Sequence, residues 1–260
     1  MSVYLNTAKA AARMAGDFLA AKHSSLRRGR VRFKKNNELV TSLDDASERM
    51  ILRVLKRRFP THSFVAEESG KRQTGSDMVW YIDPLDGTSN YVMGNPLYGV
   101  SIALAVRGEV VLGVLYFPEL THRMLWAEKE KGAWCDGKHI RVSTVANFPR
   151  ATHTFCHGKR PSDLRKTFAL YRIFLPRHIR LRHFGSAAYE LAQVALGNTD
   201  SYLSIGISPW DIAAGVCIVR EAGGAVTDGK GGAWHLGVPT MAASNGKVHA
   251  ALIRSLHGVV

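Results

Sequence analysis

The sequence predicts an α+β fold. Apolar residues near the N-terminus recur at helical spacing, whereas from residue 63 to 142 they gather in short runs typical of strands. Helical patterns return between residues 186 and 222. Because strands follow strands, with no regular βαβ alternation, we expect layers of sheet and helix instead of a doubly wound parallel sheet.

The first half is predicted to begin with two helices. Residues 3–22 form an amphipathic helix, and a second helix begins at Ser42 or Asp44 and ends before Pro60. The strand-like segments that follow pair as hairpins and continue as an antiparallel meander; they lie at residues 63–66, 78–82, 98–106, 110–117, 124–128, 132–135 and 139–142.

Residues 143–182 have weak apolar periodicity and many basic side chains. We therefore place a boundary here, between an N-terminal α+β sub-domain at 1–145 and a C-terminal α/β sub-domain at 146–260. Beyond the boundary we expect a helix at 186–196, a strand at 199–204, a helix at 211–222 and a strand at 225–228. His157, Lys159 and Arg160 lie in a loop where residues could face the substrate, but a solvated loop is the preferred interpretation.

The composition is that of a globular protein, with 260 residues of which 46% are hydrophobic and 22% are charged. No run reaches the ~18–20 apolar residues that cross a bilayer, and the N-terminus has no signal-peptide pattern. We therefore expect a cytoplasmic protein with no membrane partner. The three cysteines, Cys135, Cys156 and Cys217, form no CxxC pair, so we expect reduced thiols and neither a disulfide framework nor a thiolate metal site. The histidines have no paired ligand spacing, so we expect no zinc site.

The chain is strongly basic, with 35 Lys+Arg against 21 Asp+Glu and a formal net charge of +14. Basic runs lie at 27–35, 56–58 and 177–182. Such runs can neutralise nucleic-acid phosphates, but no aromatic-interleaved motif or recognition helix accompanies them. We therefore favour attraction of small anionic substrates over binding of nucleic acid.

The acidic residues are concentrated in four short places, namely Asp44-Asp45, Glu67-Glu68, Asp83 with Asp86, and Asp211. Neighbouring carboxylates repel one another unless a cation or a proton joins them. Hard oxygen ligands of this kind suit Mg²⁺ or Mn²⁺ better than zinc. The pattern therefore indicates a site for a small hard cation.

The segment DPLDGT at residues 83–88 is the strongest single signal. Asp83 ends an apolar strand, and the proline fixes a turn that can aim Asp83, the Leu85 carbonyl and Asp86 at one point. Gly87 lets a ligand approach the backbone, so the amides that follow can donate to phosphate oxygens. An Asx-turn with two surface aspartates would also explain this segment taken alone.

Two further acidic places complete a set. Glu67 lies at the end of another strand, 16 residues before Asp83, and Asp211 stands at a helix start. Taken singly, a solvated acidic pair and an N-cap aspartate would explain them. Taken together, the order and spacing of these acidic motifs resemble those of the inositol monophosphatase family of Mg²⁺-dependent, lithium-sensitive sugar phosphatases. Supporting matches lie at residues 39–44, 100–113, 185–188 and 221–224.

This resemblance covers essentially the whole chain and implies a five-layered α-β-α-β-α sandwich of the inositol monophosphatase and fructose-1,6-bisphosphatase type. It also implies a homodimer with an active site between the two halves of each chain. Two to three Mg²⁺ ions, or Mn²⁺ in their place, would be held by Glu67, Asp83, the Leu85 carbonyl, Asp86 and Asp211. Paired cations of this kind clamp a phosphate and activate water.

The resemblance further implies that Thr88 and Asp44, with Glu67, orient and deprotonate the attacking water. The implied substrate contacts are Asp86, Gly87, Thr88, Gly185, Ser186, Ala187, Ser204 and Asp211. The match departs at Ser204, where family members that bind inositol usually carry Glu. A hydroxyl cannot make the same charge-assisted bonds to ring hydroxyls.

The sequence therefore predicts a phosphoric monoester hydrolase for a small phosphorylated polyol, sugar or related metabolite, with inositol-phosphate phosphatase as the named activity. Histidinol phosphate, fructose 1,6-bisphosphate and phosphorylated nucleotides are alternative substrates. An alternative of another class is a binding protein, because bacterial members of the family associate with the transcription machinery. The complete set of acidic ligands favours catalysis.

Overall fold

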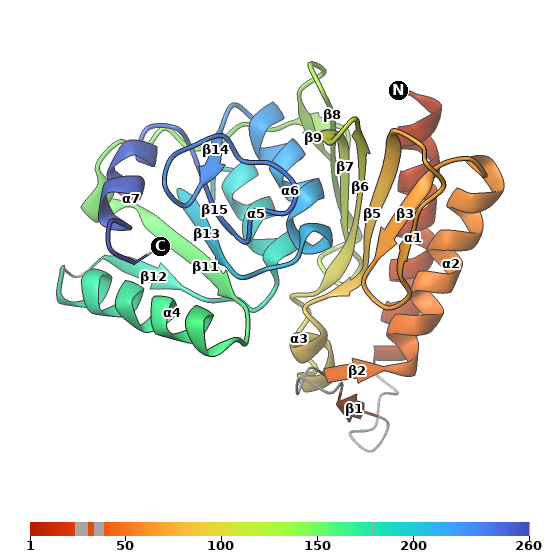
Figure 1. Ribbon diagram of the computed structural model, residues 1–260, viewed down its shortest axis with the longest axis horizontal. Coiled ribbons are helices and arrows are strands. Elements are labelled where there is room, and N and C mark those ends of the chain that lie inside the picture. The colour runs from red at the N-terminus through yellow and green to blue at the C-terminus, as the bar shows by residue number, and fades with distance from the viewer. Residues whose placement is uncertain (24–30, 34–38, 178, 260) are drawn as a thin grey trace.

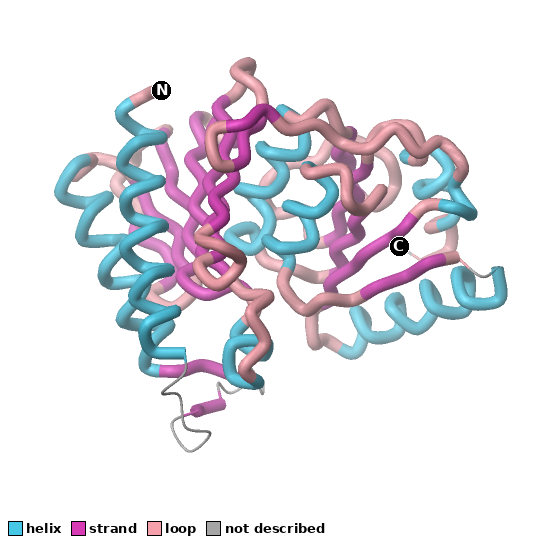
Figure 2. The backbone as a smooth tube through the Cα atoms, turned by 180° about the vertical axis from the view of Figure 1, so that it is seen from behind, coloured by secondary structure: helices cyan, strands magenta, loops and turns pink. Residues whose placement is uncertain are grey.

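The computed structural model describes residues 1–23, 31–33, 39–177 and 179–259 (Figure 1). Helices and sheets alternate in five layers, α-β-α-β-α, as the family resemblance implied (Figures 1 and 2). Most of the basic run at 27–35 lies outside the described residues. Among the residues that are described, no helix is both long enough and apolar enough to cross a membrane.

The first sheet has eight strands in the order β10-β9-β8-β7-β6-β5-β3-β4. Neighbouring strands run antiparallel, except that β3 and β5 are parallel. Its strands are β3 (Ser63–Ala66), β4 (Gly70–Arg72), β5 (Met78–Asp86), β6 (Gly99–Val106), β7 (Glu109–Phe117), β8 (Arg123–Glu128), β9 (Ala133–Cys135) and β10 (Lys138–His139). A separate antiparallel pair is formed by β1 (Val31–Phe33) and β2 (Leu39–Thr41).

Two long helices, α1 (Val3–His23) and α2 (Ser42–Arg58), form the outer layer on this sheet (Figure 1). The buried face of α1 consists largely of alanines, which allow the helix to lie close to the strands. A Cβ atom at Gly16 would lie 2.5 Å from Tyr116 Cδ1, which shows how close α1 and β7 are. The two predicted helices are thus confirmed.

The second sheet has five strands in the order β12-β11-β13-β15-β14. They are β11 (Thr152–His157), β12 (Arg180–Arg182), β13 (Ser201–Ile205), β14 (Ala225–Asp228) and β15 (Thr240–Ser244). Strand β11 runs parallel to both β12 and β13, whereas the pairs that involve β15 are antiparallel. Helices α4 (Pro161–Phe174) and α7 (His249–Ser255) pack on the outer face of this sheet.

The central layer lies between the two sheets and consists of α5 (Ala187–Ala195) and α6 (Pro209–Glu221) (Figure 1). Helix α6 packs directly against β7, where a Cβ atom at Gly113 would overlap the Ala214 carbonyl. This close contact places the N-terminus of α6, which carries Asp211, beside the first sheet. The short helix α3 (Thr88–Met93) follows β5 directly.

Some sequence predictions were wrong. No helix or strand was predicted in the stretch 143–182, but it contains β11, α4 and β12. The predicted strand at 139–142 is only Lys138–His139. Six further helices and strands were not predicted, namely β1, β2, α3, β4, β15 and α7. The division at 145/146 stays a prediction, and the core of the central layer draws residues from both sides of it.

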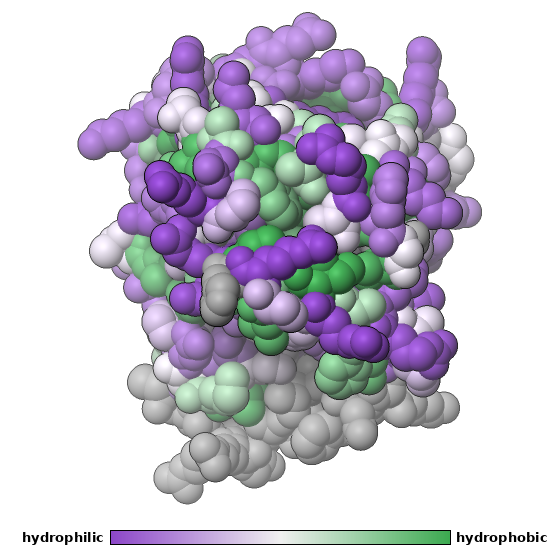
Figure 3. All heavy atoms as spheres, turned by 90° about the vertical axis from the view of Figure 1, so that its left-hand side faces the viewer, coloured by the Kyte–Doolittle hydropathy of each residue, from purple (hydrophilic) through white to green (hydrophobic). Residues whose placement is uncertain are grey.

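The face of the molecule that carries α4 is mostly hydrophilic, with smaller hydrophobic areas between the polar side chains (Figure 3). Three apolar side chains of this region, Leu164, Phe168 and Leu175, are exposed. The polar majority agrees with the high net charge and with the solvated surface that the basic runs predicted.

Candidate active site

A cavity of about 320 Å³ opens where the C-terminal end of β5 meets the central helices. One wall carries the carboxylates of Glu67, Asp83, Asp86 and Asp211. A larger cavity of about 650 Å³ lies beside Trp210, and none of its lining residues is acidic. The smaller cavity is therefore the one that combines space with reactive groups.

The turn after β5 places its two aspartates inside the protein. Asp83 pairs with Ser101 of β6 and Asp86 with Gly99, so β5 carries one extra residue in a bulge at this point. Asp83 Oδ1 accepts a hydrogen bond of 2.9 Å from the Leu85 amide, as in an Asx-turn. The two side chains are only 2% and 7% exposed, so the alternative of two surface aspartates is wrong.

Asp211 reaches the same point from the central layer. Ser208 is the N-cap of α6, and the Asp211 carboxylate accepts a 2.9 Å hydrogen bond from the Ser208 amide, which completes a capping box. Asp211 is therefore the third residue of the helix and not its N-cap. The carboxylate oxygens of Glu67, Asp83 and Asp211 include atoms that all lie within 4.8 Å of one another.

Three aspartates of the site have raised pKa values. Burial raises the pKa of Asp83 and of Asp211 well above the ordinary value, and the nearby Glu67 and Asp86 raise both pKa values further. Burial also raises the pKa of Asp86 to about 6. A divalent cation would remove this repulsion and would find only oxygen donors here. The residues thus fit Mg²⁺ or Mn²⁺.

Asp86 is held by the N-terminus of α5. Its Oδ2 accepts hydrogen bonds from the Ser186 hydroxyl and from the Ala188 amide at 2.8 Å, and its Oδ1 accepts one from the Ala187 amide at 3.2 Å. Ser186 is buried and also caps α5, whereas Gly185 and Ala187 line the cavity. Ser186 therefore positions Asp86 in this structure instead of facing the cavity.

The hydroxyl of Thr88 links the turn to α2. It lies 3.3 Å from Asp44 Oδ1 and 3.1 Å from the Leu85 carbonyl oxygen, and Asp44 is buried. Gly87, which precedes Thr88, has a φ of 88°, and a Cβ atom there would lie 2.9 Å from the Leu97 carbonyl oxygen. A residue other than glycine would therefore be strained at this position.

Ser204 lies in β13, has no exposed surface and is not among the residues that line the cavity. Its Oγ has no hydrogen-bond partner among the described residues. Its predicted contact with substrate stays a prediction, and it requires a side chain long enough to reach the cavity. A serine at this position does not reach it in this structure.

Sequence reasoning gave no role in the site to Cys156 or His183, and it preferred a solvated loop for His157 and Lys159. Cys156, His157, Lys159 and His183 line the cavity, so the loop at 157–160 is not simply solvated. His183 is 26 residues from His157 in the chain and follows β12, which was not predicted. No motif joins these residues; only the pairing of β11 with β12 brings them together.

Comparison of the sequence with models of protein families shows which family the chain belongs to. The model of the inositol monophosphatase family matches residues 1–260. The chain belongs to the inositol monophosphatase family. Members of this family are phosphatases that generally depend on Mg²⁺. The acidic groups described above could bind such a metal.

Similar proteins in the family are named either as Nus factors or as phosphatases. The chain is 33% identical over 261 residues to the Nus factor SuhB of Escherichia coli K12, covering 98% of this chain and 96% of that protein. It is 38% identical over 223 residues to a fructose-1,6-bisphosphatase/inositol-1-monophosphatase of Thermotoga maritima, covering 86% and 84%.

Solved structures of family members have the same fold. The IMPase of Thermotoga maritima is 33% identical and superposes with a TM-score of 0.90, covering 99% of this chain and 98% of that one. The extragenic suppressor protein suhB of Bartonella henselae is 32% identical, with a TM-score of 0.91 and 98% coverage of both chains. The predicted fold type is thus confirmed.

Proposed function

We propose that this protein is a Mg²⁺-dependent phosphomonoesterase that hydrolyses a small phosphorylated polyol, sugar or related metabolite in the cytoplasm. The observation that carries the proposal is the group of carboxylates formed by the buried Asp83 and the partly buried Glu67 and Asp211, which face a cavity and have their nearest oxygens within 4.8 Å of one another. Buried charges of one sign persist when a function requires them.

Glu67, Asp83, the Leu85 carbonyl, Asp86 and Asp211 would hold the metal. Bound Mg²⁺ supplies Lewis-acid stabilisation of the phosphoryl oxygens and of the leaving group. The Thr88 hydroxyl orients a water molecule toward phosphorus, and Asp44, which lies 3.3 Å from that hydroxyl, takes up the proton that the pair transfers. The amides of Gly87 and Thr88 bind phosphate oxygens. No covalent phosphoenzyme is required.

The remaining polar residues of the cavity support a polar substrate. His157, Lys159 and His183 line the same cavity as the four carboxylates. A sugar or polyol phosphate has hydroxyl groups that can bond to such donors. Because Ser204 stands where a Glu would grip inositol, we propose that inositol 1-phosphate is not the best substrate.

A phosphate-release assay tests the proposal. The purified protein should release inorganic phosphate from at least one member of a panel of inositol, sugar, amino-alcohol and nucleotide phosphates when Mg²⁺ is present. Lithium should inhibit the reaction, and an excess of chelator should abolish it. Full activity with excess chelator would contradict the proposal. Light scattering after gel filtration should give the mass of a homodimer.

A second role is supported by the names of the relatives. Several relatives that match almost the whole chain are called Nus factor SuhB, and this chain has a net charge of +14. We propose association with the transcription machinery as an additional function. Co-sedimentation of the protein with purified RNA polymerase would test it. Loss of phosphatase activity in a variant that still co-sediments would show that the two roles are separate.

A further inference from the structure

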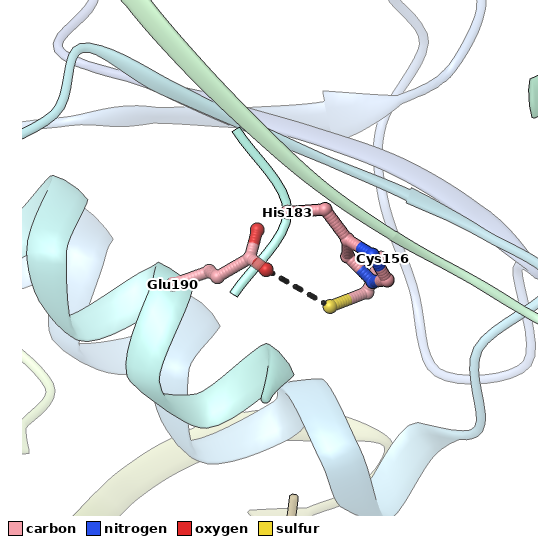
Figure 4. A group of neighbouring side chains, drawn as sticks. All are labelled: Cys156, His183 and Glu190. Atoms are coloured by element: carbon pink, nitrogen blue, oxygen red, sulfur yellow. Dashed lines mark hydrogen bonds between the residues drawn. The ribbon is translucent and has the colours of Figure 1, made fainter. Parts of the chain in front are cut away.

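Three side chains with metal-binding atoms meet beside the same cavity, and two of them, Cys156 and Glu190, have no role in the phosphatase proposal. Cys156 comes from β11, His183 follows β12, and Glu190 lies in α5. Their ligand atoms all lie within 4.8 Å of one another, and the side chains point toward a common centre (Figure 4). The Cys156 thiol donates a 3.3 Å hydrogen bond to Glu190 Oε1.

Glu190 has one anchored oxygen and one free oxygen. Oε1 also accepts hydrogen bonds from the amides of Phe184 at 2.8 Å and Gly185 at 3.3 Å. Glu190 has no exposed surface, so Oε2 is shielded from solvent, and it has no hydrogen-bond partner among the described residues. A buried carboxyl oxygen without a partner is costly, which indicates that a ligand completes this site.

We propose that Cys156, His183 and Glu190 bind a divalent cation of the zinc class, separately from the Mg²⁺ site. Thiolate, imidazole and carboxylate form a donor set typical of zinc, whereas the acidic wall offers oxygen donors alone. Ligand atoms of a tetrahedral zinc ion lie about 3.3–3.8 Å apart, given bond lengths of about 2.0–2.3 Å. Small rotations of the side chains therefore suffice to close the site.

The protonation states agree with such a site. Burial lowers the pKa of His183, and the nearby His157 lowers it further, so the imidazole is neutral and has a lone pair for a metal. Burial raises the pKa of Cys156 well above the ordinary value and that of Glu190 to about 8. Binding one Zn²⁺ would displace the thiol proton and the carboxyl proton, which leaves the three-ligand site with no net charge.

The site has an open side. Cys156 and His183 line the same cavity as Glu67, Asp83 and Asp211, and His183 is exposed. A fourth coordination position would therefore face the space that the substrate occupies. Zinc bound there would narrow this space, and we expect it to inhibit hydrolysis even when Mg²⁺ is saturating.

Titration with Co²⁺ tests the site without measuring turnover. The metal-free protein is first saturated with Mg²⁺, and Co²⁺ is then added while the charge-transfer absorption of a Co²⁺–thiolate bond is recorded. We expect one Co²⁺ per chain to give this absorption and Zn²⁺ to displace it. Cys156→Ser should abolish the absorption, whereas His183→Gln and Glu190→Gln should weaken Co²⁺ binding at least tenfold.

Matched variants make the result decisive. Cys135→Ser removes a thiol elsewhere and should leave the absorption unchanged, and Asp83→Asn should retain it because the Mg²⁺ site is not involved. Circular dichroism of each variant reports whether it is folded. A thiolate absorption that survives Cys156→Ser, or no absorption from the folded wild-type protein, would overturn the proposal. Because no turnover is measured, failure of the phosphatase assay would not affect this result.

Discussion

The Thr88 hydroxyl lies 3.3 Å from Asp44 Oδ1, although 44 residues separate the two in the chain. The same hydroxyl is 3.1 Å from the Leu85 carbonyl oxygen, and it has one proton to donate. If the carbonyl bound a metal, the proton would go to Asp44 and a lone pair would be left for water. Ser47 of α2 also donates to the Pro84 carbonyl at 2.9 Å, so α2 is fixed against this turn.

The first prediction concerns this hydroxyl. Thr88→Ala should lower kcat by about 10²-fold or more with little change in KM, because the water would lose its orienting group and its path for the proton. Thr88→Ser keeps the hydroxyl and should stay within about tenfold of the wild type. Steady-state kinetics at saturating Mg²⁺ measure both. An unchanged kcat for Thr88→Ala would remove Thr88 from the proposed chemistry.

The second prediction concerns Asp83, whose charge lies among three other carboxylates. Asp83→Asn should lower kcat at least ~10³-fold, which corresponds to about 4 kcal/mol in the barrier. The metal-free variant should be as stable as the wild type or more so, because one of the repelling charges is gone. Its Tm should no longer rise when Mg²⁺ is added.

Cys135→Ser is the control for Asp83→Asn. Cys135 lies in β9, away from the residues that line the cavity, so its kcat should remain within about twofold of the wild type. Thermal unfolding with and without Mg²⁺ completes the comparison. A normal Mg²⁺-induced rise in Tm for Asp83→Asn would show that the metal binds elsewhere.

The third prediction concerns pH. The pKa of Asp86 is raised to about 6, and the pKa values of Asp83 and Asp211 are raised as well. Protons compete with the metal for these groups, so Mg²⁺ affinity should rise as pH increases through 6. Between pH 7.5 and 5.5 we expect a loss of affinity of about fourfold or more from Asp86 alone. Calorimetric titration measures it.

The stability of the metal-free protein should change with pH in the opposite direction to its Mg²⁺ affinity. A carboxyl whose folded pKa is raised favours the folded state at low pH, and this contribution is lost as pH rises from about 4 to about 6. Metal-free wild type should therefore lose stability relative to Asp86→Asn over this interval. Denaturant unfolding at pH 4.5 and 7.5 measures the difference. A constant difference between the two proteins would contradict the raised pKa.

The fourth prediction concerns Ser204, which is buried and has an unpaired hydroxyl. Ser204→Ala should change the free energy of unfolding by less than about 1 kcal/mol, because no hydrogen bond is lost. Ser204→Glu should destabilise the protein by about 2–4 kcal/mol if the carboxylate stays buried. A Glu that reaches the cavity should instead improve kcat/KM for inositol 1-phosphate. Denaturant unfolding and kinetics together distinguish these outcomes.

The sequence by itself determined the parts of the molecule that depend on local pattern. Helical periodicity predicted α1 and α2, and a run of apolar residues predicted β3 at Ser63–Ala66. The helices and strands could be predicted because side-chain period and turn chemistry are fixed by residues within a few positions of one another. The fold type and the roles of the acidic residues around the cavity were implied by the resemblance to the inositol monophosphatase family that the acidic motifs carry.

The tertiary structure alone decided the contacts between distant segments. It placed Ser186 on Asp86, 100 residues away, and buried Ser204 outside the cavity. It also brought Cys156 within reach of Glu190 across β11 and α5. Periodicity is weak in 143–182, so the sequence did not reveal β11 or α4, and the wall that they help to build was missed. Contacts of this kind depend on how whole layers pack, which no local pattern records.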